Sequence, residues 1–302
     1  MQKKIIAFGE LVWDVFQDGR KMGGAPVNLV YRVNTLGNQG ILVSRVGNDL
    51  DGEEALKMLA KLVITHEYVQ TDSQFPTGTA MVKVGSEGRP DYVIASDLAF
   101  DHIVMTPEIL TLAGEADCIC FGTLVQRAPI SRNTLRELLG AAPGALKYLD
   151  LKLRKNCFTP EVIRESLRLA HILRVKENEL YQLKNLLGLF EFESRALAQE
   201  LAGEYNLEVV LVTRSKSGAF GVDSQGRYFE DRGYIIDLLD TVGSGAAFSA
   251  AFLHVYLEER NPEEALRFGN AAGALTAETH GATIPISRKQ ITELIRTGKR
   301  RI

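Results

Sequence analysis

Short apolar runs with the character of buried strands alternate along the chain with runs whose apolar residues recur at helical spacing. The first kind, at residues 4–9, 40–46, 117–121, 146–151 and 209–212, predicts strands, and the second, at 27–36, 134–139 and 160–169, predicts helices. This alternation is typical of βαβ units, which form a mostly parallel sheet flanked by helices. The 302 residues show no linker, low-complexity run or internal repeat, so the sequence predicts one α/β domain over residues 1–302.

One segment departs from the alternation. Residues 79–95 contain two strand-like runs on either side of a Gly/Pro turn at 85–90, a pattern that predicts a hairpin. Residues 12–16 predict another short strand. We therefore expect a small β layer, formed from about residues 11–24 and 77–101, to act as a lid over a site.

Composition and charge exclude several classes of protein. The 35 basic residues are outnumbered by 38 acidic ones, which argues against a dedicated nucleic-acid binder. The apolar stretch at 5–8 is too short for the core of a signal peptide, and the one at 246–257 is shorter than the ~20 residues that span a membrane. The three cysteines show no zinc-binding spacing, and Cys118 and Cys120 share one face of a predicted strand, where they would pack. We expect a cytoplasmic protein without a membrane partner.

The strongest local signal is the run Asp-Thr-Val-Gly-Ser-Gly-Ala-Ala-Phe at residues 240–248, which leads into a helical pattern. Small residues at the start of a helix leave backbone N–H groups free at its positive end, and this arrangement favours an anion. A tight turn that packs a helix against a sheet explains the same glycines. The run is not a dinucleotide fingerprint, because Phe248 stands where the third glycine would be, and no Gly-Lys-Ser/Thr follows as in a Walker loop.

A second glycine cluster, Gly-Gly-Ala-Pro-Val-Asn, occupies residues 23–28. Glycine lets a ligand approach the backbone closely, and Asn28 offers a hydrogen-bond donor and an acceptor together. A loop that precedes a helix, with Pro26 in the first turn, accounts for the cluster equally well.

Taken in order, these motifs resemble the PfkB (ribokinase-like) family of sugar kinases, and most closely its fructokinase-type members. The resemblance rests on Gly-Glu-Leu-Val-Trp-Asp at 9–14, the cluster at 23–28, Val-Gly-Asn-Asp at 46–49, Thr-Gly-Thr-Ala at 77–80, the run at 240–245 and His-Gly-Ala at 280–282. It implies a ribokinase-like fold and transfer of the ATP γ-phosphate to a sugar hydroxyl, most simply that of fructose. It also implies Mg²⁺ on the phosphates, a monovalent cation, and a homodimer formed through the lid.

The resemblance also implies a role for each matching residue. It assigns the sugar to Asp14, Gly23, Gly24 and Asn28, with Phe100 and Asp101 closing the lid. It assigns the transferred phosphate to the amides of Gly243, Ser244 and Gly245 and to Arg154, and Arg127 fits either a substrate contact or a surface salt bridge. The nucleotide side would comprise Lys176, Glu179, Thr213, Ser215, Gly218, Asp240 and Gly281, where Glu179 would help to organise the metal indirectly.

Four positions depart from the family pattern. Ala246 stands where the family has its catalytic aspartate, Lys152 and Lys176 stand where it usually has asparagine, and Ser215 replaces a glycine, whereas Glu179 is retained. One lost carboxylate and two added ammonium groups make the site more positive by three charges. Loss of a general base removes a factor of about 10²–10⁴ in rate, and a lysine near the metal position repels Mg²⁺ and attracts phosphate directly.

Three functions fit the sequence. The first is a fructokinase-type sugar kinase whose activity is impaired at Ala246. The second is an inactive sugar- or phosphate-binding relative with a regulatory role, and the third is a nucleoside kinase.

Overall fold

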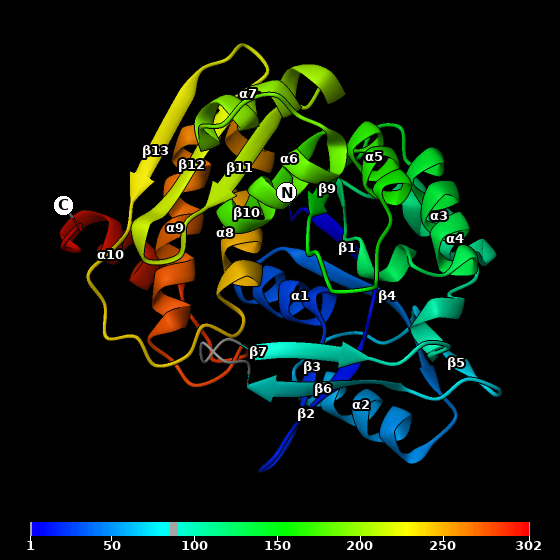
Figure 1. Ribbon diagram of the computed structural model, residues 1–302. Helices are drawn as coiled ribbons and strands as arrows, with labels where there is room; N and C mark the ends of the chain where they lie inside the picture. The colour runs from blue at the N-terminus through cyan, green and yellow to red at the C-terminus, as the bar shows by residue number, and fades with distance from the viewer. Residues whose placement is uncertain (1, 85–89, 302) are drawn as a thin grey trace.

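A nine-stranded sheet forms the centre of the computed structural model, which describes residues 2–84 and 90–301 (Figure 1). The strand order is β13-β12-β11-β10-β9-β8-β1-β4-β5. The pairs from β5 to β11 are parallel, and β12 and β13 add an antiparallel edge. The strands are β1 Lys4–Phe8, β4 Gln39–Gly47, β5 Val69–Asp72, β8 Cys118–Phe121, β9 Leu146–Asp150, β10 Ile172–Lys176, β11 Val209–Thr213, β12 Gly218–Asp223 and β13 Tyr228–Arg232.

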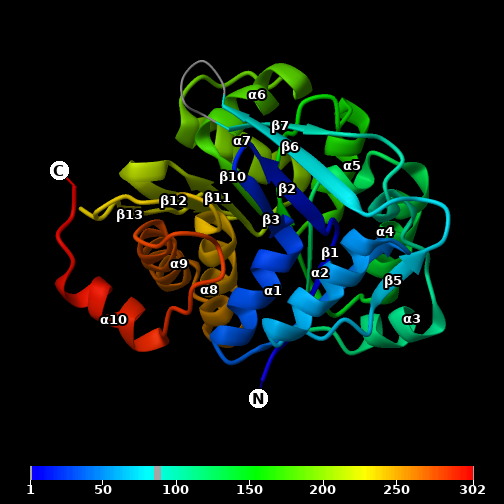
Figure 2. The same ribbon diagram turned by 90° about the horizontal axis from the view of Figure 1, so that it is seen from below.

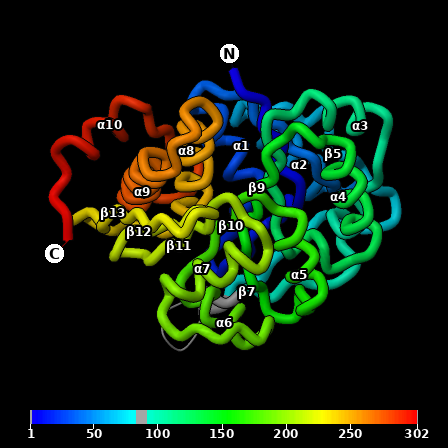
Figure 3. Tube along the Cα trace, turned by 90° about the horizontal axis from the view of Figure 1, so that it is seen from above, coloured from blue at the N-terminus to red at the C-terminus, as the bar shows by residue number. Residues whose placement is uncertain are grey.

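The central strands are apolar on both faces because helices cover both. In β1, Ile5 and Ala7 belong to one buried cluster, and Ile6 and Phe8 belong to another on the opposite face. This follows from the two-residue period of a strand. Figures 2 and 3 show α8 and α9 together on one side of the sheet and α6 and α7 on the other. The mostly parallel sheet flanked by helices is thus confirmed.

The helices begin and end at recognisable signals. Proline stands in the first turn of α1, α3, α4, α5 and α9, where its missing N–H costs nothing. The helices are α1 Ala25–Thr35, α2 Leu50–Lys61, α3 Pro107–Gly114, α4 Pro129–Ala141, α5 Pro160–Leu169, α6 Glu177–Leu187, α7 Ser194–Tyr205, α8 Ser244–Glu259, α9 Pro262–Ala277 and α10 Arg288–Thr297, with the short 3₁₀ turns η1 Ala99–His102, η2 Leu124–Gln126 and η3 Ser215–Ser217. No helix in residues 2–84 and 90–301 has the length and apolar character that a bilayer crossing requires.

A second, four-stranded sheet lies beside the main one, in the order β3-β2-β6-β7. Its strands are β2 Val12–Phe16, β3 Gly19–Gly23, β6 Gly78–Val84 and β7 Pro90–Ile94. The predicted strand at 12–16 and the predicted hairpin are both present, since β6 and β7 pair antiparallel. The predicted turn falls largely on residues 85–89, outside the described residues.

Candidate active site

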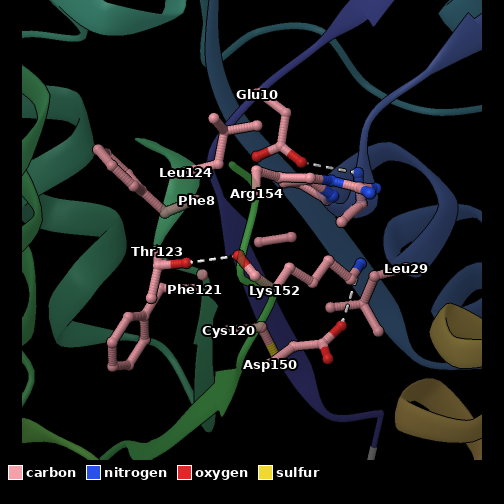
Figure 4. A pocket seen from close by; sticks show the side chains of 14 residues that line it. Phe8, Glu10, Leu29, Cys120, Phe121, Thr123, Leu124, Asp150, Lys152 and Arg154 are labelled. Atoms are coloured by element: carbon pink, nitrogen blue, oxygen red, sulfur yellow. Dashed lines mark hydrogen bonds and ion pairs between the residues drawn. The ribbon is translucent and has the colours of Figure 1, made fainter. Parts of the chain in front are cut away.

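One pocket lies where the parallel strands β1, β8 and β9 end, which is the usual place for a ligand in an open α/β sheet. Figure 4 shows Glu10, Arg154, Lys152 and Asp150 following one another across it. The apolar part of the lining comes mainly from β1, β8 and the first two turns of α1, including Phe8, Cys120, Phe121 and Leu29. Charged groups therefore meet an apolar wall in one place.

Asp14, on β2 of the small sheet, contributes a carboxylate beside this pocket. Its side chain lies so close to Gly23 that a Cβ there would overlap it. Burial raises the pKa of Asp14 to about 6; Arg154 opposes this shift and Glu10 adds to it. Asp14, Arg154 and Glu10 thus interact electrostatically in one partly dry environment.

The glycine cluster brings the chain from the small sheet into α1. Gly24 has φ 108°, a left-handed conformation that favours glycine, and a Cβ there would collide with the carbonyl oxygen of Glu10. Glu10 Oε1 accepts a hydrogen bond of 3.0 Å from the N–H of Ala25. Asn28 follows in the first turn and is half-buried. Its backbone N–H bonds the carbonyl of Gly24, but its side-chain amide has no partner among the described residues. Gly23 therefore lies directly against Asp14, and Gly24 leads the chain from there past Glu10 into α1.

The second glycine cluster forms the start of α8. Gly243 has φ 83° and packs tightly against Ala282. The N–H of Ser244 bonds the carbonyl of Thr241 at 3.3 Å, but among the described residues no backbone oxygen pairs with the N–H groups of Gly245 or Ala246. The buried hydroxyl of Ser244 also lacks a partner there. These unpaired donors at a helix N-terminus form a cradle for an anion.

Asp240 stabilises the loop that precedes α8. Its two carboxylate oxygens accept the N–H of Val242 at 2.9 Å and that of Gly281 at 3.1 Å. The second bond ties the turn at Gly281, which was predicted to lie near the nucleotide, to the loop before α8. Gly281 has φ 93°, a conformation that favours glycine. Burial raises the pKa of Tyr92, on β7, and Asp14 and Asp240 both add to the rise. Tyr92 therefore lies within electrostatic range of both halves of the site.

The position expected to carry the catalytic base is a buried methyl group. Ala246 is 5% exposed, in the first turn of α8. Asp150, a half-buried carboxylate that lines the pocket, is already engaged: Lys152 lies 3.3 Å from Oδ2 and Arg174 lies 2.9 Å from Oδ1. Burial would raise the pKa of Asp150, but these two cations outweigh it and hold the pKa below its usual value. A carboxylate with a lowered pKa is a weak proton acceptor.

Arg174 and Glu10 were not assigned roles by the sequence reasoning. Arg174 is 3% exposed, donates to Thr213 Oγ1 at 3.0 Å as well as to Asp150, and lies against Gly245. An arginine in the middle of the apolar strand β10 was the signal that could have revealed it, because a charge is buried only with partners.

Lys152 and Arg154 line the pocket, and Lys176 lies within electrostatic range of both. The Arg154 guanidinium lies 4.0 Å from the centre of the Tyr92 ring. Desolvation by the surrounding protein is the largest cause of the lowered pKa of Lys176, and Arg174, Lys152 and Arg154 act in the same direction. The three predicted cations therefore lie together.

Glu179 is buried and serves the backbone. Oε1 accepts the N–H of Leu153 at 3.2 Å, and Oε2 accepts the N–H of Lys176 at 3.1 Å. Across the described residues no cluster of three or more His, Cys, Asp or Glu side chains could hold a metal ion. Both oxygens of Glu179 are engaged, and Arg174 and Lys176 lie within electrostatic range of it, so Glu179 does not offer the free carboxylate that Mg²⁺ takes as a ligand.

Two predicted sugar contacts lie elsewhere. Phe100 is fully buried in the cluster beneath the small sheet. Asp101 forms a two-pronged ion pair with Arg127, with distances of 2.8 and 2.7 Å, and caps the N–H of Leu98. Asp101 and Arg127 line a separate pocket with Cys157. The pair is largely buried, so the salt bridge of Arg127 is an internal one and not a surface one.

The remaining predicted nucleotide residues follow β11. Thr213 is bonded to Arg174, Ser215 opens η3 with φ 51°, and Gly218 has φ 89° and no room for a side chain. The left-handed backbone at Ser215 explains why glycine suits this position.

Comparisons with known proteins agree with this fold. Residues 1–289 match the model of the pfkB family of carbohydrate kinases. The chain is 26% identical over 290 residues to a 2-dehydro-3-deoxygalactonokinase of Haloferax volcanii, covering 92% of this chain and 88% of that one. A sugar kinase of Pyrococcus horikoshii in complex with ATP is 26% identical, with TM-score 0.80 and 97% of each chain covered. A fructokinase of Xylella fastidiosa with bound ATP shares the fold, with TM-score 0.82 at 19% identity over 98% of this chain and 99% of that one.

Proposed function

Since the chain belongs to the pfkB family of carbohydrate kinases, we propose that it binds a sugar, fructose in the first instance, together with ATP, and that it transfers the γ-phosphate slowly. The proposal rests chiefly on one observation. The unpaired amides of Gly245 and Ala246 open the same helix whose first turn lacks a carboxylate. Binding elements are present, and the proton acceptor is absent.

The sugar is assigned to the space beside Asp14. An ionised carboxylate accepts hydrogen bonds from two hydroxyl groups, and Gly23 and Gly24 let the sugar approach the backbone. The half-buried amide of Asn28 supplies a further donor and acceptor. The small sheet, which carries Asp14 and Tyr92, acts as the lid that excludes water from this space.

The phosphate is assigned to the start of α8. Phosphoryl transfer depends mainly on positioning and on neutralising charge, so amides and cations retain much of the catalytic power when the base is missing. Arg154, which interacts electrostatically with Asp14, is placed to contact the sugar or the transferred group. Ala246 cannot accept the hydroxyl proton, and this slows transfer by a factor of about 10²–10⁴.

A second candidate is a sugar-binding protein without kinase activity. The engagement of Asp150 with Lys152 and Arg174 favours it, because the carboxylate that lines the pocket is then no substitute base.

Calorimetric titration with fructose and with ATP tests the proposal. We expect both ligands to bind the unmodified protein and Asp14→Ala to weaken fructose binding about 10–100-fold, as expected for a lost hydrogen bond to a charged group. ATP binding should be unchanged in that variant. A folded protein that binds neither ligand would overturn the proposal. Steady ATP consumption in the presence of fructose favours the slow kinase, and binding without any consumption favours the second candidate.

A further inference from the structure

We propose that the polyphosphate of the nucleotide binds at this site without a divalent cation, its charge being met by the ammonium group of Lys176 with Lys152 and Arg154. This inference rests on the proposed function, because it concerns the nucleotide of the same site. It names a feature in which this chain differs from a metal-dependent kinase.

Glu179 is the acid that a metal at this position would need, and both of its carboxylate oxygens are engaged. Glu179 uses one carboxylate oxygen for the N–H of Leu153 and the other for the N–H of Lys176. These two bonds join the end of β9 to the end of β10 and fix where the side chains of Lys152 and Lys176 begin. Glu179 thereby positions the cations, and its oxygens are engaged rather than turned to a metal.

Among the groups that most affect the pKa of Lys176, cations outnumber acids. The ionised groups that affect the pKa of Lys176 most are Glu179, which raises it, and Arg174, Lys152 and Arg154, which lower it. Arg174 and Lys152 both pair with Asp150. Among residues 2–84 and 90–301, neither Lys176 nor Arg154 makes an ion pair with a carboxylate. Lys176 has Glu179 within electrostatic range, and Arg154 has Asp14, but neither the ammonium nor the guanidinium group is held in a direct ion pair. Both can turn to an anion, which they attract, whereas they repel a divalent cation.

The start of α8 and the nearby lysines can bind a phosphate group without a metal. The free amides at the start of α8 supply directed hydrogen bonds, and flexible ammonium groups supply charge without demanding octahedral geometry. ATP without a metal carries more negative charge than its magnesium complex. A site that supplies its own cations therefore has no need of the metal and binds the free nucleotide at least as tightly.

The experiment is calorimetric titration of the full-length protein with ATP, once in excess EDTA and once in excess Mg²⁺. The variants are Lys176→Met, which keeps the aliphatic stem, and Lys176→Arg, which keeps the charge. The control is Lys155→Met, since Lys155 is an exposed cation on the same loop as Arg154 but lines the other pocket. Thermal melting checks that each variant is folded.

We expect the unmodified protein to bind ATP as tightly in EDTA as in Mg²⁺, or more tightly. Lys176→Met should lose about tenfold or more of its affinity in EDTA, whereas Lys176→Arg should retain most of it and Lys155→Met should change little. A tenfold gain on adding Mg²⁺ to the unmodified protein overturns the inference and leaves the proposed kinase function standing. Equal losses in Lys176→Met and Lys155→Met also overturn it, since a general effect of surface charge would then suffice. Absence of ATP binding under both conditions overturns the proposed function as well.

Discussion

The guanidinium group of Arg174 lies directly against Gly245, so that a Cβ on that glycine would come within 3.0 Å of an Arg174 nitrogen. Gly245 precedes Ala246 in the first turn of α8. Arg174 also joins Asp150 and Thr213 from the neighbouring strands. A single buried cation therefore connects the sheet to the helix start where the anion is expected.

The contact at Gly245 predicts that Gly245→Ala disturbs the site. The added methyl group must displace Arg174, which is held by Asp150, so we expect lower thermal stability and weaker ATP binding. Gly140→Ala is the matched control, because Gly140 lies in α4 with open space around it. Alanine should stabilise that helix by about 0.5–1 kcal/mol. Thermal melting of both variants would contradict this account if Gly245→Ala melted no lower than the unmodified protein.

Removing the charge of Arg174 should destabilise the fold. In Arg174→Met the half-buried Asp150 keeps only Lys152 as a partner, and the cost approaches the value of about 3–5 kcal/mol for breaking a fully buried ion pair. Urea unfolding measures this loss. The double variant Arg174→Met/Asp150→Asn should recover part of it, since no unpaired charge is left. An Arg174→Met midpoint equal to that of the unmodified protein would refute the structural role assigned to this residue.

Sugar binding should depend on pH through Asp14. Its pKa is raised to about 6 by burial, so the carboxyl is protonated below that pH and accepts fewer hydrogen bonds. We expect fructose affinity to increase as the pH rises from 5 to 7 and to level off above. The stability contribution has the opposite sign, because burial favours the protonated form: it is largest at low pH and declines as the pH rises through about 6. Titrations at several pH values test this, and Asp14→Asn should bind weakly with a flat profile.

Ser215→Gly should stabilise the loop after β11. Ser215 has φ 51°, a conformation that costs a residue with a side chain about 1 kcal/mol and costs glycine little. The greater freedom of glycine in the unfolded chain offsets part of this gain. We therefore expect a small rise in melting temperature. A fall of several degrees would show that the Ser215 side chain makes a stabilising interaction.

The sequence was sufficient for the fold because its strong signals are local. The buried run at 4–8 and the prolines at helix starts specify β1 and the helices before any tertiary contact is considered. The two-residue spacing of Cys118 and Cys120 correctly placed their sulfur atoms together, 3.8 Å apart. The glycine clusters also correctly indicated tight turns of the backbone, since Gly24 and Gly243 both have positive φ.

The site could be predicted less well from the sequence, because it depends on contacts between residues that are far apart along the chain. Asp101 and Phe100 follow the hairpin in sequence, but pairing with Arg127 and burial in the core decide where they point. The link between Arg174 and Gly245 joins residues on β10 and α8, and no local pattern specifies it. Glu179 matches the acidic residue of the family pattern, but only the fold shows that its two oxygens accept hydrogen bonds from backbone N–H groups.

The most direct test is the rate of fructose-dependent ATP consumption by the unmodified protein and by Ala246→Asp. The account predicts slow consumption in the former and an increase of about 10²–10⁴-fold in the latter, because the new carboxylate lies in the first turn of α8 beside the phosphate amides. Ala246→Ser, which adds a polar group without a carboxylate, should give no such gain. A folded Ala246→Asp variant that binds both ligands and turns over no faster than the unmodified protein would contradict the account.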